Sequence, residues 1–313
     1  MPPPTLQTTP DLLVLAPEPL TRESFAPFGT AIIPPLPRNT TTPPTPLSTH
    51  PTQNLVPRPA LANQGSALKY SPISPVTNQY PGQCPSGKAS EARMTMFSCF
   101  PRSLRLVSDR AAGGGGKVAE KGVFDVRILE RHPFTTQTFI PLDLSSRFRT
   151  STSTSTSTST CTGTGTGTGT GTSISTATRI AREKEENTER GEEEEEEEEE
   201  EEAHYLVVVA PTLKGQTALA ASDSGAKVSI RDPPDLGRAR AFLACGGQAV
   251  TYAAGTWHAP MVVLGRRRVD FVVVQFVNGV DGEDCQEVRF GEGLVVDCGV
   301  EGARSGSRSG AKL

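Results

Sequence analysis

The sequence predicts an all-β domain, a sandwich or a barrel, with a few short helices and a long disordered insert. Segments of strand length that are apolar or alternate in polarity recur along the chain. Residues typical of turns separate them at short intervals, which is the pattern of sandwiches and barrels. No glycine-rich phosphate loop follows a strand and opens a helix, so a nucleotide-binding fold has no support.

The first half of the chain contains six segments with strand character. They are residues 12–16, 28–33, 63–70, 93–102, 123–129 and 139–142. Residues 123–129 alternate in polarity, so we expect a single strand with one buried face. Thr21 precedes a short helix that it is expected to cap.

The second half contains a denser series of strand segments. A β-branched strand is expected over residues 204–210, where Pro211 ends it. Residues 236–243 suit either one helix face or a short strand. Further strands are expected at 249–253, 261–264 and 269–277.

We predict one domain over residues 11–300 that is interrupted twice. The first interruption is a Pro/Thr-rich loop at 34–59. The second is an insert at 145–203 with Ser/Thr and Gly/Thr repeats and a run of glutamates, which cannot bury enough apolar surface to offset the entropy of ordering it. Residues 1–10 are expected to be a disordered tail and residues 301–313 a flexible one.

Composition and charge exclude some classes of function. Apolar residues make up 35% of the chain, below the globular average of roughly 45–50%, because the low-complexity tracts dilute the folded part. Removing the eleven glutamates 192–202 from the net charge of −4 leaves +7. Basic and aromatic residues are not concentrated together, so no nucleic-acid surface is predicted.

Cysteine usage and the chain ends bear on location. The six cysteines form no CxxC pair, so free thiols in a reducing compartment are expected. No apolar stretch reaches the roughly 20 residues of a membrane span, and no signal peptide is recognised. Ala311-Lys312-Leu313 is a variant of the Ser-Lys-Leu peroxisomal address. We therefore expect a cytoplasmic or peroxisomal protein, in the second case with an import receptor as partner.

Two of the four histidines are candidates for chemistry. His50 lies in the Pro/Thr-rich loop, and His204 begins a strand after the acidic run and is expected to be exposed, so neither is expected to take part. His132 and His258 each stand where a strand meets a Pro-terminated turn, at the rim of a barrel, where ligands commonly bind. An imidazole pKa of about 6.5 suits general acid/base work. The alternative is a turn histidine bonded to the backbone, and the neighbouring Trp257 is expected to be a packing residue.

The same residues resemble a metal triad. Glu130 and His132 are two residues apart and therefore face the same way on a strand. With His258 they would supply two imidazoles and one carboxylate. No His-x-His occurs, however, and jelly-roll metal sites have more histidines. We expect no cofactor, with these three residues as the ligands if a divalent metal binds.

Around both histidines the sequence resembles a known family. Residues 130–141 (ERHPFTTQTFIP) and 250–260 (VTYAAGTWHAP) resemble the two signatures of the ureidoglycolate lyases. Residues 270–285 are similar to the end region of that family. The segments 63–70 and 85–88 look like those of fungal members.

The resemblance runs from about residue 12 to residue 296, and several long blocks in order are more specific than one short motif. It implies a cupin-like double-stranded β-barrel, a jelly-roll architecture, usually as a homodimer. The implied activity is the cleavage of (S)-ureidoglycolate to glyoxylate and urea in allantoin and purine catabolism. This chain departs from the family in its insert between Leu144 and Ala203, which the barrel should tolerate because loop closure costs grow slowly with length.

The implied reaction needs three kinds of group: a base for the substrate hydroxyl, an acid for the departing nitrogen and a cation for the carboxylate. His258 is the leading candidate for the base. His132 is a candidate for the acid or for orienting the substrate.

Four further residues are candidate substrate ligands. Lys69 and Arg93 could hold the carboxylate by charge-assisted hydrogen bonds. Tyr252 and Gln137 could bind the hydroxyl or ureido groups.

Three alternatives remain open at this point. The domain could be a non-catalytic cupin-like module that binds a small carboxylate. It could be an amidohydrolase that releases ammonia and carbon dioxide from the same substrate. The low-complexity tracts could instead make the chain an interaction scaffold.

Overall fold

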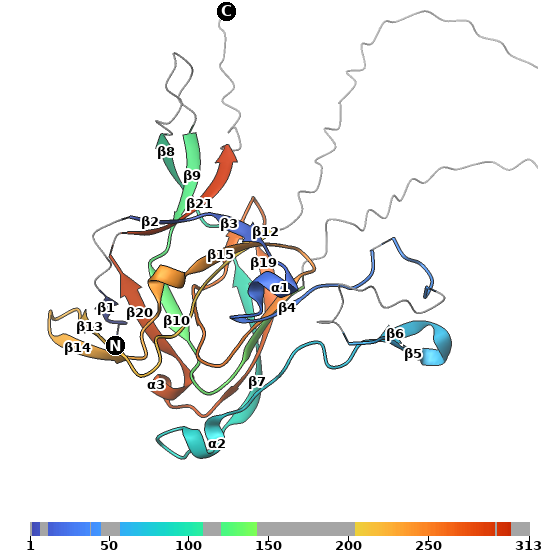
Figure 1. Cartoon of the computed structure of the whole chain (residues 1–313), viewed down its shortest axis with the longest axis horizontal. Helices are drawn as coiled ribbons and strands as arrows, with labels where there is room; N and C mark the ends of the chain where they lie inside the picture. The colour runs from blue at the N-terminus through green and yellow to red at the C-terminus, as the bar shows by residue number, and fades with distance from the viewer. Residues whose placement is uncertain are drawn as a thin grey trace, which may run out of the picture. The chain divides into compact units, whose positions relative to one another are not determined.

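A computed structural model describes residues 2–6, 12–37, 39–44, 57–108, 120–142, 204–291 and 293–301, all of which belong to one unit of the chain. Strands dominate this part, and the helices within it are short (Figure 1). The α-helices are α1 (Arg22–Phe25), α2 (Tyr80–Gln83) and α3 (Asp281–Asp284), and the 3-10 helices are η1 (Asn63–Gly65) and η3 (Leu236–Arg238). The all-β class predicted from the sequence is confirmed.

The strands of the described residues form four sheets. The ten-stranded sheet has the order β14 (Lys227–Arg231), β13 (Thr217–Ala221), β1 (Thr5–Leu6), β20 (Gln286–Phe290), β10 (Ile128–Arg131), β17 (Trp257–His258), β12 (His204–Ala210), β15 (Arg240–Cys245) and β3 (Pro17–Pro19), with β18 (Val262–Leu264) also paired to β12. The five-stranded sheet has the order β4 (Gly29–Ile32), β16 (Ala249–Tyr252), β11 (Gln137–Pro141), β19 (Val269–Val277) and β7 (Glu91–Cys99). The four-stranded sheet has the order β2 (Leu13–Leu15), β21 (Leu294–Glu301), β9 (Glu120–Asp125) and β8 (Arg105–Ser108), and a hairpin joins β5 (Ala60–Ala62) to β6 (Ala67–Lys69).

The central strands of the ten-stranded sheet are covered on both faces, as β12 shows. Tyr205, Val207 and Val209 belong to one apolar core, which they share with Phe139 and Phe271 of the five-stranded sheet. The residues between them on β12 belong to a second core with side chains of the four-stranded sheet. Because alternate side chains of a strand point to opposite faces, a strand buried on both faces reads as the continuous apolar run seen in the sequence.

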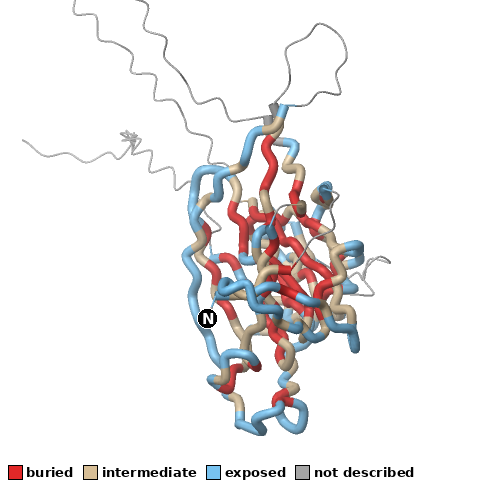
Figure 2. Tube along the Cα trace, turned by 90° about the vertical axis from the view of Figure 1, so that its left-hand side faces the viewer, coloured by how far each residue is buried: buried red, intermediate tan, exposed pale blue. Residues whose placement is uncertain are grey.

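At the centre of the sheet, one face carries apolar packing residues and the opposite face carries the polar candidate residues. Leu129 and Trp257 face the second core. Their neighbours Glu130 and His258 therefore face the five-stranded sheet. Figure 2 shows the buried residues concentrated in the interior of the described part, with exposed residues mainly around them.

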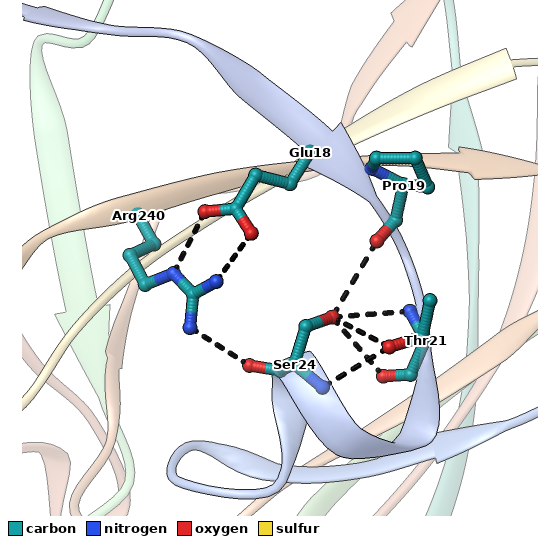
Figure 3. Close-up of polar contacts among 5 residues, drawn as sticks. All are labelled: Glu18, Pro19, Thr21, Ser24 and Arg240. Carbon is teal, nitrogen blue, oxygen red and sulfur yellow. Dashed lines mark hydrogen bonds and ion pairs between the residues drawn. The ribbon is translucent and has the colours of Figure 1, made fainter.

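The N-terminal segment is attached to the ten-stranded sheet by a local polar network (Figure 3). β3 pairs in parallel with β15, and Arg240 on β15 forms an ion pair with Glu18 while donating to the carbonyl of Ser24. Thr21 and Ser24 form a capping box at the start of α1. The cap predicted at Thr21 is thus confirmed.

Several expected segments differ in detail from the structure. The single strand expected over residues 123–129 is two strands, β9 and β10, which belong to different sheets. Residues 63–70 are not one strand: they contain η1, in which Asn63 and Gln64 have positive φ, and then β6, which begins at Ala67. Residues 236–243 contain η3 and then β15. His204, expected to be exposed, is half-buried at the start of β12.

The expected tails and loops are only partly described. Thr5–Leu6 forms β1, paired with β13 and β20, so the disordered tail expected over residues 1–10 is wrong there. Leu6 is buried in a core, which the composition of this segment does not indicate. The described parts of the 34–59 loop hold no helix or strand. The insert 145–203, His50 and residues 302–313 lie outside the described residues. No helix in the described part is long and apolar enough to cross a membrane.

Candidate active site

The two candidate histidine segments meet directly. β10 and β17 are antiparallel neighbours, and Glu130 is the register partner of His258. The amide of Gly255 also donates to the carbonyl of His132 at 2.8 Å. The rings of His132 and His258 consequently lie with their centroids 5.6 Å apart.

His258 is surrounded by hydrogen-bond acceptors and is 1% exposed. Its Nδ1 lies 3.0 Å from the carbonyl of Thr256. Its Nε2 lies 3.0 Å from Oε1 of Gln137 and 3.4 Å from Oε1 of Glu130. An imidazolium donates from both nitrogens, so these surroundings suit a protonated ring beside an ionised carboxylate.

His132 has a different environment. Its Nδ1 donates to the carbonyl of Asp284 at 2.6 Å, which leaves Nε2 with a lone pair. That Nε2 is buried and has no hydrogen-bond partner among the described residues. Burial and the neighbouring His258 lower the pKa of His132, outweighing the Asp284 carbonyl and nearby carboxylates. The ring is therefore a neutral acceptor at neutral pH.

Glu130 lies between the imidazoles and a thiol. Burial opposes its charged form, but its hydrogen bond with His258 and the two imidazoles outweigh burial and lower the pKa of Glu130. The thiol of Cys285 lies 3.9 Å from the other carboxylate oxygen. Burial and the Glu130 charge raise the pKa of Cys285, so this sulfur stays protonated and is a poor nucleophile.

Three candidate substrate ligands lie along one row across the five-stranded sheet. Gln137 on β11 is the register partner of Tyr252 on β16. On the other side Gln137 donates to Oε1 of Gln275 at 2.7 Å, and Gln275 is the register partner of Arg93 on the edge strand β7. Register partners point to the same face, so Arg93 shares a face with Gln137.

Tyr252 packs flat against His258. Its ring is stacked on the imidazole with the centroids 3.9 Å apart and an interplanar angle of 12°. Burial raises the pKa of Tyr252 well above its usual value, so the phenol stays neutral. Its hydroxyl is buried without a hydrogen-bond partner among the described residues.

The cationic candidates differ in position. Arg93 is about half exposed and forms an ion pair with the exposed Glu91 at 2.7 Å, the kind of surface pair that contributes little energy. Lys69 is exposed at the end of β6, in a hairpin that belongs to neither large sheet. The structure thus brings Arg93, but not Lys69, onto the sheet that carries Gln137.

Glu130, His132 and His258 also form a group that could hold a metal ion. One ligand atom from each lies within 4.8 Å of the others. Glu130, Cys285 and Glu287 form a second such group among the described residues. The first group is the better ligand set, because it contains two imidazoles and its His132 Nε2 has no other partner.

The comparison with known proteins agrees with this geometry. The sequence model of the ureidoglycolate lyase family matches residues 12–156 and 194–297. The chain belongs to the ureidoglycolate lyase family. It is 27% identical to a ureidoglycolate lyase of Schizosaccharomyces pombe, with 85% of this chain and 86% of the relative covered. It is 28% identical to one of Saccharomyces cerevisiae, with 91% and 98% covered.

Bacterial ureidoglycolate lyases match a shorter segment. One from Burkholderia mallei is 42% identical over 60 residues, which covers 19% of this chain and 34% of the relative. The break in the family match, residues 157–193, falls within the insert between β11 and β12. The insert therefore interrupts the family's sequence without separating β10 from β17.

Two groups at this ureidoglycolate lyase site were not anticipated. Gln275 was detectable, because positions 269, 271, 273 and 275 alternate toward the core. The carbonyl of Asp284 had no sequence signal, since any residue type carries a backbone carbonyl.

Proposed function

We propose that this chain cleaves ureidoglycolate to glyoxylate and urea, with His132 and His258 as its acid/base pair. The observation that supports this most is the contrast between the two imidazoles. His132 presents a bare Nε2, whereas His258 faces only acceptors and the Glu130 carboxylate.

In the proposed reaction the Nε2 of His132 accepts the proton of the substrate hydroxyl. The O–H electrons form the carbonyl of glyoxylate while the bond from carbon to the ureido nitrogen breaks. His258, charged beside Glu130, donates the proton that the departing nitrogen needs. These roles are the reverse of those expected from the sequence, because each ring's hydrogen-bond partners decide which nitrogen can accept a proton.

The substrate carboxylate and polar groups are assigned to the row across the five-stranded sheet. Arg93 would exchange Glu91 for the substrate carboxylate in a charge-assisted pair. Gln137 and Tyr252, which contact His258, would bind the hydroxyl or ureido groups. Lys69 remains a second candidate for the carboxylate.

The same three residues would hold a divalent metal. Glu130, His132 and His258 match a two-histidine, one-carboxylate ligand set. A bound ion would polarise the substrate oxygen and stabilise negative charge on it. In that case Tyr252, Gln137 and Arg93 would keep their roles in orienting the substrate.

Activity is tested by following glyoxylate and urea together from purified protein, with and without chelator. We expect both products in equal amounts, and their loss in His132→Ala and His258→Ala. His204→Ala, a histidine at the far end of β12, is the matched control and should retain full turnover.

Other outcomes separate the alternatives. Ammonia in urease-free buffer would identify an amidohydrolase. Substrate binding without products would identify a binding module. Activity that requires residues 151–202 would point to the tracts as functional, and loss with chelator that returns with added metal would establish the ion.

We also propose that the protein forms a homodimer through the outer face of the five-stranded sheet. Met94 and Met96 on the edge strand β7 are 71% and 61% exposed. The row beside them continues through Val272 to Ile140, which is 40% exposed. An exposed apolar edge strand is a pairing surface unless it is covered.

A second copy is the occupant that fits this face. The segment that follows β11, residues 143–203, is a poor cover for an apolar face because it has few large apolar side chains, namely Leu144, Phe148, Ile174 and Ile180. We expect sedimentation to report a dimer that Met94→Lys with Met96→Lys dissociates. Leu219→Lys, at a residue 62% exposed on β13, is the control, and a wild-type monomer at micromolar concentration would refute the proposal.

Import into peroxisomes stays a prediction. Ala311, Lys312 and Leu313 lie outside the described residues. Fluorescent fusions with and without this tripeptide would test it.

A further inference from the structure

The tautomer of His132 depends on one backbone carbonyl. Nδ1 donates to the carbonyl of Asp284 at 2.6 Å, and this bond keeps the opposite nitrogen free. Asp284 ends α3, which is only four residues long. So short a helix does not hold its last residue rigidly by its own hydrogen bonds.

The side chain of Asp284 supplies the missing restraint. Its carboxylate accepts from the amide of Asn278 at 2.8 Å and from the amide of Gly279 at 2.7 Å. It also accepts from the hydroxyl of Tyr80 at 2.6 Å. Tyr80 is the only side-chain donor among these three groups, and it lies far from α3 in the sequence.

Tyr80 contacts the turn after His132 and also the residue whose carbonyl binds His132. It is 1% exposed, and its ring packs against that of Phe134 with the centroids 5.5 Å apart. The residue before it, Gln79, donates its amide to the carbonyl of Phe134 at 2.7 Å. One end of Tyr80 therefore reaches the turn after His132, and its hydroxyl reaches the group that binds the imidazole.

The loop around Tyr80 is itself fixed to α3. Glu283 is 7% exposed, and its carboxylate accepts from the amide and the hydroxyl of Ser86, each at 2.7 Å. It also accepts from the side-chain amide of Asn278 at 2.6 Å. These bonds hold the Tyr80 loop and α3 together. Two attachments therefore join the loop to α3: the Ser86–Glu283 bonds and the Tyr80–Asp284 bond.

We propose that Tyr80 is a positioning residue whose hydroxyl fixes Asp284 so that the Asp284 carbonyl holds His132 in the Nδ1-protonated tautomer. The inference rests on the proposed role of His132 in the reaction. Hydrogen-bond partners that orient metal-ligating histidines typically affect activity by roughly 10–100-fold, and we expect an effect of the same order here.

The test compares two buried tyrosines in the full-length chain. Tyr80→Phe removes the hydroxyl that binds Asp284. Tyr205→Phe is the matched control, because its buried hydroxyl also donates one bond of 2.6 Å, but to the carbonyl of Gln248. Both variants should show similar losses of thermal stability.

Nitrogen NMR of 15N-histidine protein reports the tautomer directly, with His132 assigned from a His132→Gln sample. We expect the Nδ1-protonated signature in the wild type and in Tyr205→Phe, and a mixture of tautomers in Tyr80→Phe. Turnover in Tyr80→Phe should fall by about tenfold with KM changed less than twofold. Tyr205→Phe should keep both within twofold.

The outcomes are distinguishable. An unchanged tautomer in Tyr80→Phe overturns the inference, whether or not turnover falls. A changed tautomer with full turnover supports the positioning role but refutes the proposed base. If Tyr80→Phe does not fold, Asp284→Asn is measured in the same way, since its amide nitrogen cannot accept from all three donors.

Discussion

Glu130 and His258 face each other across the β10–β17 pair, with Oε1 of the carboxylate 3.4 Å from Nε2 of the imidazole. The hydrogen bond with His258 and the two imidazoles lower the pKa of Glu130 although it is largely buried, and a carboxylate at this distance would stabilise the imidazolium that the proposed acid requires. This pair joins the β10 and β17 segments of the candidate site.

Glu130→Gln should lower turnover by about 100-fold, in the range for loss of general acid–base catalysis. The amide retains the size of the carboxylate but cannot stabilise a charged His258. Rates of glyoxylate release measure the effect. Glu287→Gln, at the register partner of Glu130 on β20, is the control, and equal turnover in the two variants would remove the ion pair from the mechanism.

Tyr252→Phe should raise KM for ureidoglycolate without lowering the stability of the protein. The hydroxyl has no partner among the described residues, and burying such a group costs about 1–3 kcal/mol. Chemical unfolding and initial rates measure the two effects. An unchanged KM would show that this hydroxyl does not touch the substrate.

Gly29→Ala should destabilise the protein by about 1–3 kcal/mol, the usual range for overpacking. Gly29 has φ of 151°, and a Cβ there would lie 1.9 Å from the carbonyl of Thr251 on the neighbouring strand. Gly282→Ala is the control, since a Cβ there meets no atom within 4 Å. Equal midpoints of urea unfolding would contradict the close approach of β4 and β16.

Stability should fall on acidification partly through Glu283. Hydrogen bonds from Ser86 and Asn278 lower the pKa of Glu283 despite its burial. A lowered carboxyl pKa contributes stability above the unfolded value of about 4.3, and this contribution is lost as the pH falls through the folded value.

Unfolding midpoints between pH 6 and pH 3 measure this effect. The slope should be smaller in Glu283→Gln than in the wild type. Glu23→Gln, an exposed glutamate on α1, should keep the wild-type slope, and an unchanged slope in Glu283→Gln would refute the assignment.

The sequence predicted features that depend on neighbouring residues. The strand 269–277 and the cap at Thr21 agree with the structure, because side-chain alternation and capping repeat over two to four positions. The break between β9 and β10 was missed, since apolar residues continue through Val126 whichever sheet each strand joins.

The order of the signature segments and the identity of the histidines were determined by the sequence alone. Only the tertiary structure decided that β10 pairs with β17, that Tyr252 stacks on His258, and that the carbonyl of Asp284 binds His132. The physical reason is that cross-strand register and backbone acceptors depend on residues distant in the chain, whereas a local pattern records only which face a side chain occupies.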